Sequence, residues 1–178
     1  MKNSLKTILI MDISLILIIK FLNIFFNLYI LIGKINQRFV VTFLILMLII
    51  ISLIYFNNSN HKKLKQVYKF ISCVFIIPIL LFWMIPMNED CYFYFKSPDN
   101  SKTLVAEEHS FLLFGRSYFY EKKYHILIKS LPYCIDIDDG IRIFSLNEYK
   151  IKWIDNNTVY LEYDSGCGLY SDITIKLP

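Results

Sequence analysis

The sequence predicts a membrane protein in two parts: three transmembrane helices followed by a small all-β domain, an antiparallel sandwich or part-open barrel. Three observations predict this division. Hydrophobic residues make up 56% of the 178 residues, more than soluble domains usually contain. Long apolar runs end near residue 87, and short runs rich in aromatic and β-branched residues follow. Residues 1–87 carry nine basic residues and one acidic residue, whereas residues 88–178 carry ten and fourteen.

Three apolar stretches are expected to cross the bilayer, at residues 13–32, 39–56 and 67–86. Each approaches the roughly 20 residues that cross about 30 Å of hydrocarbon at about 1.5 Å per residue. The third stretch contains Pro78, which predicts a kink, and Trp83, which predicts an interfacial anchor. The first stretch is longer than a signal-peptide core and lacks an Ala-x-Ala-like site, so we expect it to be retained.

Basic residues that flank these stretches predict the orientation. One side of the membrane receives six lysines: Lys2, Lys6, Lys62, Lys63, Lys65 and Lys69. The other side receives Lys34 and Arg38. Because cytoplasmic loops keep the positive excess, the N-terminus is predicted to be cytoplasmic and residues 88–178 extracytoplasmic, in a multi-pass protein of the cell membrane. The basic excess is thus a topology signal, and a nucleic-acid partner is not expected.

The chain is rich in Ile, Phe, Tyr, Asn and Lys, which are residues that the codons of an AT-rich genome favour. This bias indicates a low-GC bacterium as the source.

A stripe of polar side chains interrupts the first stretch at Asp12, Lys20, Asn23 and Asn27. Their helical spacing places them on one face, which we expect to contact protein because such groups are costly against lipid. One hypothesis is a proton or ion path. The simpler interpretation places Asp12 at the cytoplasmic boundary, with Lys20 extending toward it and the asparagines bonding the other spans or a second copy. The partners expected are the lipid bilayer and another membrane or envelope protein, and a homo-oligomer is compatible with this stripe.

Short apolar runs separated by turn residues predict nine strands after residue 87. They are expected near 92–96, 103–108, 110–113, 116–122, 125–129, 141–144, 149–154, 158–163 and 172–177. The clearest hairpin covers residues 149–163. There Tyr149, Ile151 and Trp153 alternate with polar residues before an Asp-Asn-Asn turn. About ninety residues are enough for one small core.

Four runs within this domain resemble a known group of proteins. They are Phe95–Glu108, Leu112–Arg116, Ile137–Gly140 and Tyr149–Asp155. These runs are similar to segments of small membrane-anchored proteins of Gram-positive bacteria that carry a domain of unknown function. The similarity covers residues 95–163. It implies an extracytoplasmic β domain and no particular chemistry, although members usually have fewer spans.

Candidate chemistry concentrates in an acidic segment, Asp136, Asp138 and Asp139, which resembles the start of a calcium loop. The glycine at 140 comes one position too early, and Glu148 misses the final ligand position. A solvated acidic turn is therefore favoured over weak calcium binding. Glu107 and His109 share a strand face but lack a third converging ligand. We predict no metal site and no cofactor.

The cysteines allow one disulfide, and the one candidate serine nucleophile lacks the sequence of a catalytic triad. Cys91, Cys134 and Cys167 all fall in the predicted outer domain, where a disulfide is allowed. The preferred pair is Cys134 with Cys167, and the alternative is three free thiols. Ser110 beside His109 does not form a triad pattern, because no nucleophile-elbow sequence surrounds it.

These observations favour a non-enzymatic membrane protein whose outer β domain serves in interaction or sensing. Two alternatives remain open on the sequence. One is an enzyme that modifies an envelope component with the acidic segment at 136–139. The other is a small transport or channel component that uses the polar stripe.

Overall fold

The computed structural model describes residues 2–57, 62–84, 90–111, 114–138, 140–165 and 168–178. The chain divides into two compact units. One contains residues 1–26 and 35–87 and is helical. The other contains residues 27–34 and 88–178 and is built from strands. The predicted combination of apolar helices with an antiparallel β domain is confirmed.

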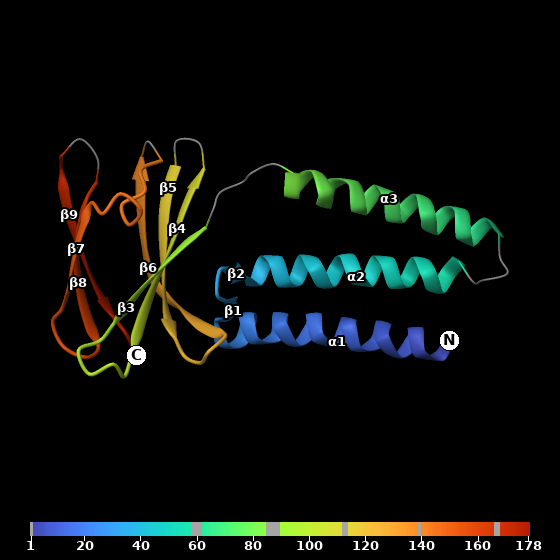
Figure 1. The fold of residues 1–178 in the computed structure, drawn as a ribbon, viewed down its shortest axis with the longest axis horizontal. Helices are drawn as coiled ribbons and strands as arrows, with labels where there is room; N and C mark the ends of the chain where they lie inside the picture. Colours follow the sequence, from blue (N-terminus) through green and yellow to red (C-terminus); the bar gives the residue numbers. More distant parts are fainter. Residues whose placement is uncertain (1, 58–61, 85–89, 112–113, 139, 166–167) are drawn as a thin grey trace. The chain divides into compact units, whose positions relative to one another are not determined.

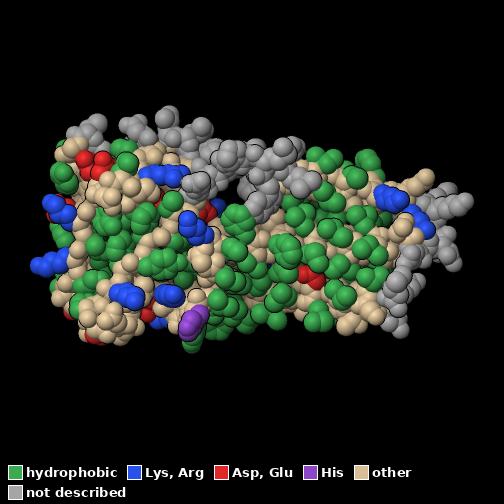
Figure 2. Space-filling model, in the orientation of Figure 1, with side chains coloured by type: hydrophobic (Ala, Val, Ile, Leu, Met, Phe, Trp, Pro, Cys, Tyr) green, Lys and Arg blue, Asp and Glu red, His purple; other side chains and the backbone are tan. Residues whose placement is uncertain are grey.

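Three helices form the first unit (Figure 1). They are α1 (Lys2–Phe26), α2 (Gln37–Asn57) and α3 (Lys62–Met84). Within this unit α2 contacts both of the others. Among the described residues, α1 and α2 are long and apolar enough to cross a membrane. Figure 2 shows that hydrophobic side chains cover most of the visible helical surface, as lipid-facing helices require.

Side chains fix the start of α2 and its packing on α3. Asn36 caps α2, because its Oδ1 accepts a hydrogen bond of 3.2 Å from the Phe39 amide. In the C-terminal half of α2, the hydroxyl of Ser52 hydrogen-bonds with that of Tyr68 on α3. The Tyr68 ring stacks on Phe56 with 4.5 Å between the ring centroids. These contacts join α3 to the C-terminal half of α2.

Two antiparallel sheets contain the strands, and all strands except β2 belong to the second unit. The larger sheet, sheet A, has the strand order β2-β1-β6-β5-β4-β3, and the smaller, sheet C, has the order β7-β8-β9. The strands of sheet A are β1 (Leu28–Ile32), β2 (Ile35–Asn36), β3 (Cys91–Lys96), β4 (Thr103–Phe111), β5 (Phe114–Lys122) and β6 (Leu127–Asp138). Those of sheet C are β7 (Tyr149–Trp153), β8 (Thr158–Asp164) and β9 (Tyr170–Lys176).

The main core lies between one face of sheet A and sheet C. Sheet A contributes Leu104, Ala106, Phe119, Leu131, Ile135 and Ile137, and sheet C contributes Val159, Leu161 and Ile175. Phe144, which is 1% exposed, lies in the segment between β6 and β7. Its ring contacts those of Phe93, Phe119 and Tyr149 at 4.9 to 6.2 Å. This aromatic cluster fixes the segment against the core.

The structure corrects the end of the first apolar stretch. The prediction that this stretch continues as a helix to Ile32 is wrong, because α1 ends at Phe26 and β1 begins at Leu28. Asn27 has φ of 52°, a left-handed conformation that stops the helix, and Gly33 at φ of 63° turns the chain after β1. Leu28 then pairs opposite Lys129, and Ile30 opposite Leu127. Strand β1 of the β domain thus comes from the connection between α1 and α2.

The other strand predictions had different outcomes. The expected hairpin of residues 149–163 is formed by β7 and β8, with Ile151 opposite Leu161 and Trp153 opposite Val159. By contrast, the run at 141–144 is not a strand. The run expected at 125–129 is the start of β6, which continues to Asp138.

Candidate functional site

The face of sheet A that points away from the core carries most of the candidate residues of the β domain. We call it the tyrosine face, defined by Tyr29, Tyr92, Tyr94, Tyr118 and Tyr120. Alternation along β4 produces it: Leu104 and Ala106 enter the core, whereas Val105 and Glu107 point the other way. A second small cluster of buried residues lies here, formed by Leu31, Val105, Tyr120 and Ile128. The tyrosine face is therefore partly apolar and partly polar.

Glu107 is the polar centre of the tyrosine face. Tyr92 donates a hydrogen bond of 2.7 Å to one carboxylate oxygen, and Tyr120 donates one of 2.6 Å to the other. The Tyr29 ring meets Tyr120 edge-on at 5.8 Å, which connects β1 to this network. Burial, and then the charge and hydrogen bond of Glu107, raise the pKa of Tyr120 far above its ordinary value. Tyr120 thus remains a neutral donor to a carboxylate.

Two side-chain pairs flank the network. His109 Nδ1 pairs with the carboxylate of Asp90, and their side chains are 27% and 12% exposed. Arg116 forms a bidentate pair with Asp136. Its Nε donates a hydrogen bond to Oδ1, and its Nη2 donates one of 2.9 Å to Oδ2. The hydrogen bond with Asp136 is the main cause of a raised pKa of Arg116. Arg116 also lies over the Tyr118 ring, 5.8 Å from its centroid.

The described part of the acidic segment is a strand and not a calcium-type loop. Asp136 and Asp138 belong to β6 rather than to a turn, and Asp136 is engaged by Arg116. The side chain of Asp138 and the whole of Asp139 lie outside the described residues. Within the described part of the chain, no three His, Cys, Asp or Glu side chains come together as a metal site would need.

Glu108 is a functional group that the sequence did not identify. It is 2% exposed on the core face of β4. Its carboxylate accepts bonds of 2.8 Å from the Phe144 amide and 3.2 Å from the Ser145 amide, and a third from the Ser145 hydroxyl. Glu108 therefore anchors the segment between β6 and β7. The signal was available in the sequence, because alternation from Leu104 and Ala106 places residue 108 in the core.

The remaining candidates of the β domain are separate from one another. Ser110 donates a bond of 3.0 Å to the Gly140 carbonyl and has no contact with His109 that would activate it. Cys134 on β6 is exposed and Cys91 is half-buried, and neither is joined by a disulfide to a described cysteine. Cys167 lies outside the described residues, so the expected disulfide remains a prediction.

In the helical unit, the expected polar stripe divides. Asn27 is beyond the end of α1, and its place on the stripe is a wrong prediction. Asp12 and Asn23 are eleven residues apart and therefore share one face of α1, which is partly buried. Lys20 is exposed. Asp12 Oδ2 and Asn23 Nδ2 are buried and have no hydrogen-bond partner among the described residues.

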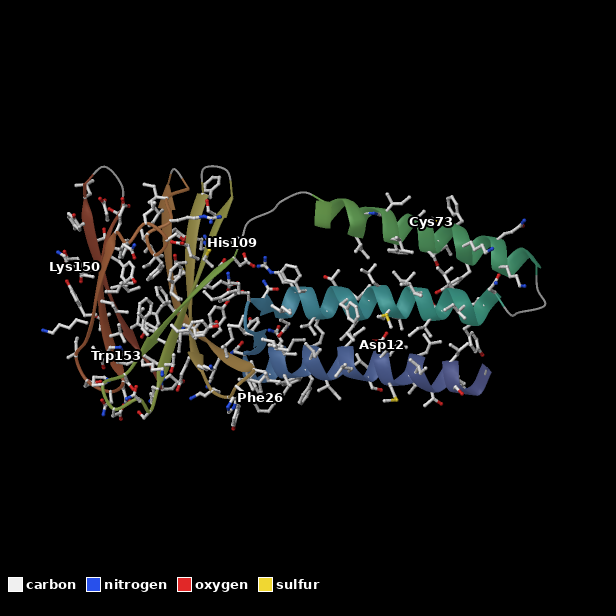
Figure 3. All side chains as sticks on the ribbon, in the orientation of Figure 1. Asp12, Phe26, Cys73, His109, Lys150 and Trp153 are labelled. Atoms are coloured by element: carbon white, nitrogen blue, oxygen red, sulfur yellow. The ribbon has the colours of Figure 1, made fainter. Side chains whose placement is uncertain are left out.

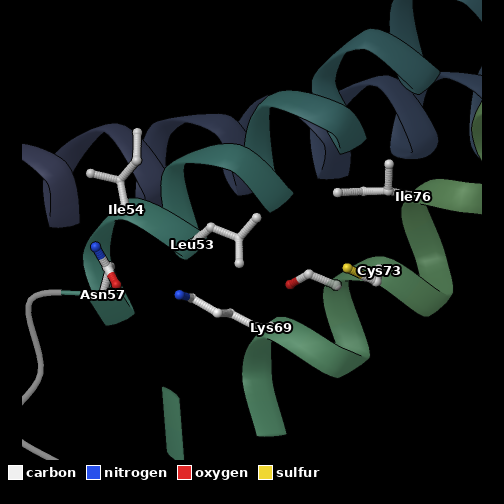
Figure 4. Close-up of a pocket in the computed structure, with 7 residues that line it drawn as sticks. Leu53, Ile54, Asn57, Lys69, Cys73 and Ile76 are labelled. Atoms are coloured by element: carbon white, nitrogen blue, oxygen red, sulfur yellow. The ribbon is translucent and has the colours of Figure 1, made fainter. Parts of the chain in front are cut away.

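Asp12 lines an open groove of about 520 Å³ between α1 and α2 (Figure 3). The groove is otherwise almost entirely apolar; its lining includes Ile8, Met11, Leu15, Phe43 and Met47. A second open groove, of about 370 Å³, lies between α2 and α3 (Figure 4). Lys69 is the charged residue of its lining, beside Asn57, Ser72 and Cys73. The helical unit thus has one groove with an acid and one with a base.

Comparison with known proteins returned no match to a protein-family model, a curated protein or a solved structure. The functional argument therefore depends on the residues of this chain. They offer two distinct features: the tyrosine face of the β domain, and the pair of charged grooves among the helices.

Proposed function

We propose that the chain is a three-span membrane protein that holds its β domain outside the cytoplasm, where the domain recognises another molecule of the envelope. The N-terminus is cytoplasmic in this proposal, and α3 is the third span. The domain acts in interaction or sensing rather than in catalysis. The observation that carries the topology is the pairing of β1 with β6.

β1 supports three spans because of its place in the chain. It lies between α1 and α2, whereas its partner β6 follows α3. Two strands that exchange backbone hydrogen bonds lie on the same side of a membrane, since an open sheet edge does not persist in hydrocarbon. The chain therefore crosses the membrane an even number of times between Ile32 and Leu127. If the strongly apolar α2 crosses the membrane, α3 must cross it in the opposite direction to bring β6 to the side of β1.

The distribution of basic residues gives the direction. The segment between α1 and α2, which supplies β1, carries only Lys34 and Arg38 near the membrane. Six lysines flank the opposite ends of the helices. The positive-inside rule places this lysine-rich end of the helices on the cytoplasmic side, and β1 with the rest of the β domain outside.

The tyrosine face supports recognition as the role of the domain. Tyrosine and arginine are enriched at protein interfaces, because they combine apolar area with hydrogen-bonding groups. Tyr94 is 45% exposed there, with the ammonium of Lys122 5.7 Å from its ring centroid. His109 and Arg116, which are ionisable groups beside the network, already have carboxylate partners. Their pairing favours a binding surface over a site of proton transfer.

Thiol labelling tests the topology. Cys134 is a native, exposed reporter in the β domain, and Gln66→Cys places a second reporter at an exposed position near the start of α3. Each is left as the sole cysteine by changing the others to serine. In intact spheroplasts, a membrane-impermeant maleimide should label Cys134 at once and Gln66→Cys only after permeabilisation. Labelling of Gln66→Cys from outside would contradict the proposal.

Photocrosslinking in native membranes tests recognition. A benzophenone amino acid replaces Tyr94 on the tyrosine face or, as the matched control, exposed Lys152 on sheet C. We expect a discrete light-dependent adduct from position 94 and none from position 152. No adduct from position 94, or the same set of adducts from both positions, would contradict recognition through this face.

A further inference from the structure

The early end of α1 changes the depth of Asp12 in the membrane. Because the helix stops at Phe26, about 20 residues of hydrocarbon-spanning helix extend back to roughly residue 7. Asp12 lies 14 residues before Phe26, which is about 21 Å along the axis. It is therefore within the hydrocarbon, and not at the cytoplasmic boundary where the apolar pattern suggested.

Lys20 and Asp12 differ in how they can be accommodated at these depths. Lys20 is exposed and only six residues from the end of α1, so its long side chain reaches the outer headgroups. Asp12 has a short side chain and lies toward the cytoplasmic half of the span. Its Oδ2 is buried beside the α1–α2 groove and has no partner among the described residues. An acid in this position calls for a basic or hydrogen-bonding partner at the same depth.

Lys69 is at that depth on α3. It precedes Met84, the last residue of α3, by 15 residues, or about 22 Å. Lys69 is exposed in the α2–α3 groove, and no ion pair joins it to a described residue (Figure 4). Within the helical unit, α1 and α3 each pack on α2. The acid and the base therefore belong to two different grooves of one chain.

We infer that the chain binds a second copy of itself within the membrane, with α1 of one copy in the α2–α3 groove of the next, so that Asp12 meets Lys69. This inference rests on the proposed three-span topology, in which α1 and α3 cross in the same direction. Copies with the same orientation then present Asp12 and Lys69 at equal depth. Each apolar groove accepts the neighbouring helix, and the long side chain of Lys69 gives Asp12 a partner of opposite charge within the hydrocarbon.

The contact is head-to-tail, because two different surfaces meet. Each copy uses its α1 side for one neighbour and its α3 side for another, so a closed ring forms if the rotation closes. A symmetric pair, in which α1 meets α1, would instead place Asp12 against Asp12. Like charges at that depth are unfavourable. The charges thus select the head-to-tail arrangement.

Disulfide crosslinking between copies tests this arrangement. Leu15 lines the α1–α2 groove and Cys73 lines the α2–α3 groove, and each is 11 residues before the end of its helix. The full chain carries Leu15→Cys and native Cys73, with Cys91, Cys134 and Cys167 changed to serine. Oxidation in membranes should give a ladder of dimers and larger species. Leu17→Cys, at an exposed position of α1 that does not line the groove, is the matched control and should give none.

Charge reversal tests the pair itself. Asp12→Lys and Lys69→Asp should each lower the yield of the ladder by about tenfold, and the double reversal should restore it. Asp12→Lys with Lys20→Asp is the control and should not restore it. Equal insertion and protease resistance of all variants show that the helices and the β domain still fold.

Three outcomes would overturn the inference. A crosslink that persists after Cys73→Ser and stops at the dimer shows an α1–α1 contact. Absence of any crosslink, together with single-step photobleaching of labelled protein in membranes, shows a monomer. Failure of the double reversal to restore the ladder shows that Asp12 and Lys69 do not meet. The maleimide experiment separates the two proposals, because a cytoplasmic Gln66→Cys without a ladder contradicts the assembly and leaves the topology standing.

Discussion

Two carboxylates, one in each unit of the chain, have opposite surroundings. Glu108 is buried in the β domain and accepts three hydrogen bonds from Phe144 and Ser145. Asp12 lies among the helices, and its buried Oδ2 has no hydrogen-bond partner in the described part of the chain. Burial of a charge is tolerated when it is paired or fully hydrogen-bonded. Glu108 therefore belongs to the architecture of the fold, whereas Asp12 marks a surface that another group should complete.

The strongest test of this contrast is Glu108→Ala. Loss of the carboxylate leaves the Phe144 and Ser145 amides without acceptors next to the core, so the free energy of unfolding should fall by about 3 kcal/mol. Urea unfolding followed by Trp153 fluorescence, in detergent and in a Trp83→Phe background, measures it. Glu162→Ala removes a half-exposed carboxylate paired with Lys150 at 3.3 Å and should cost less than about 0.5 kcal/mol. Equal losses from the two changes would remove the distinction between Glu108 and a surface acid.

Gly115→Ala tests whether close packing also fixes the segment that Glu108 holds. A Cβ at Gly115 would lie 2.5 Å from the backbone oxygen of Ile141, which cannot move aside like a flexible side chain. We expect a loss of about 2 kcal/mol in the same unfolding measurement. Exposed Thr174→Ala, also on a strand, should change it by less than about 0.5 kcal/mol. A neutral Gly115→Ala would mean that Glu108 alone positions the segment.

Tyr120→Phe extends the contrast to Glu107, the half-buried carboxylate of the tyrosine face. Removal of one of its two tyrosine donors should cost about 1 kcal/mol. The raised pKa of Tyr120 also predicts a pH effect, since the folded phenol stays neutral where the unfolded phenol ionises. The contribution of Tyr120 to the free energy of unfolding is fully present below about pH 10 and is lost as the pH rises further. Stability measured between pH 9 and pH 11 should decline less steeply in Tyr120→Phe than in the exposed control Tyr170→Phe, and parallel curves would refute this role.

The smallest effect is expected from Asp12→Asn. If Asp12 is not part of the architecture, the free energy of unfolding of the β domain should change by less than about 0.5 kcal/mol. The Trp153 measurement applies again, with Glu108→Ala as the positive control. A loss as large as that of Glu108→Ala would show that Asp12 supports the fold, and the contrast between the two carboxylates would fail.

Local patterns in the sequence predicted much of the β domain. The alternation of Tyr149, Ile151 and Trp153 predicted the β7–β8 hairpin, and these three residues pack against the core. The alternation along β4 likewise predicted that Glu107 and His109 share one face. Such features follow from the period of two along a strand, so they are visible without knowledge of tertiary contacts.

What the sequence did not predict depends on contacts between distant segments. The run Leu28–Ile32 is as apolar as α1, and only its pairing with β6 makes it a strand. Ile143 and Phe144 look like part of a strand, since a short apolar run does not distinguish a strand from a buried turn. The hydrogen bonds to Glu108, 36 and 37 residues away in sequence, decide the conformation there. The distance of Asp12 from the end of α1, 14 residues, became clear only when that end was known.

The position of β1 also bears on how the protein is made. Leu28 is synthesised 101 residues before its partner Lys129. At about 5 to 20 residues per second, ribosomes take roughly 5 to 20 seconds to cover that interval. During this time β1 waits without its partner β6 while α2 and α3 emerge. A chaperone or a membrane insertase that shields residues 28–32 would protect the newborn chain, and a fragment that starts at residue 88 would be left with the bare backbone edge of β6.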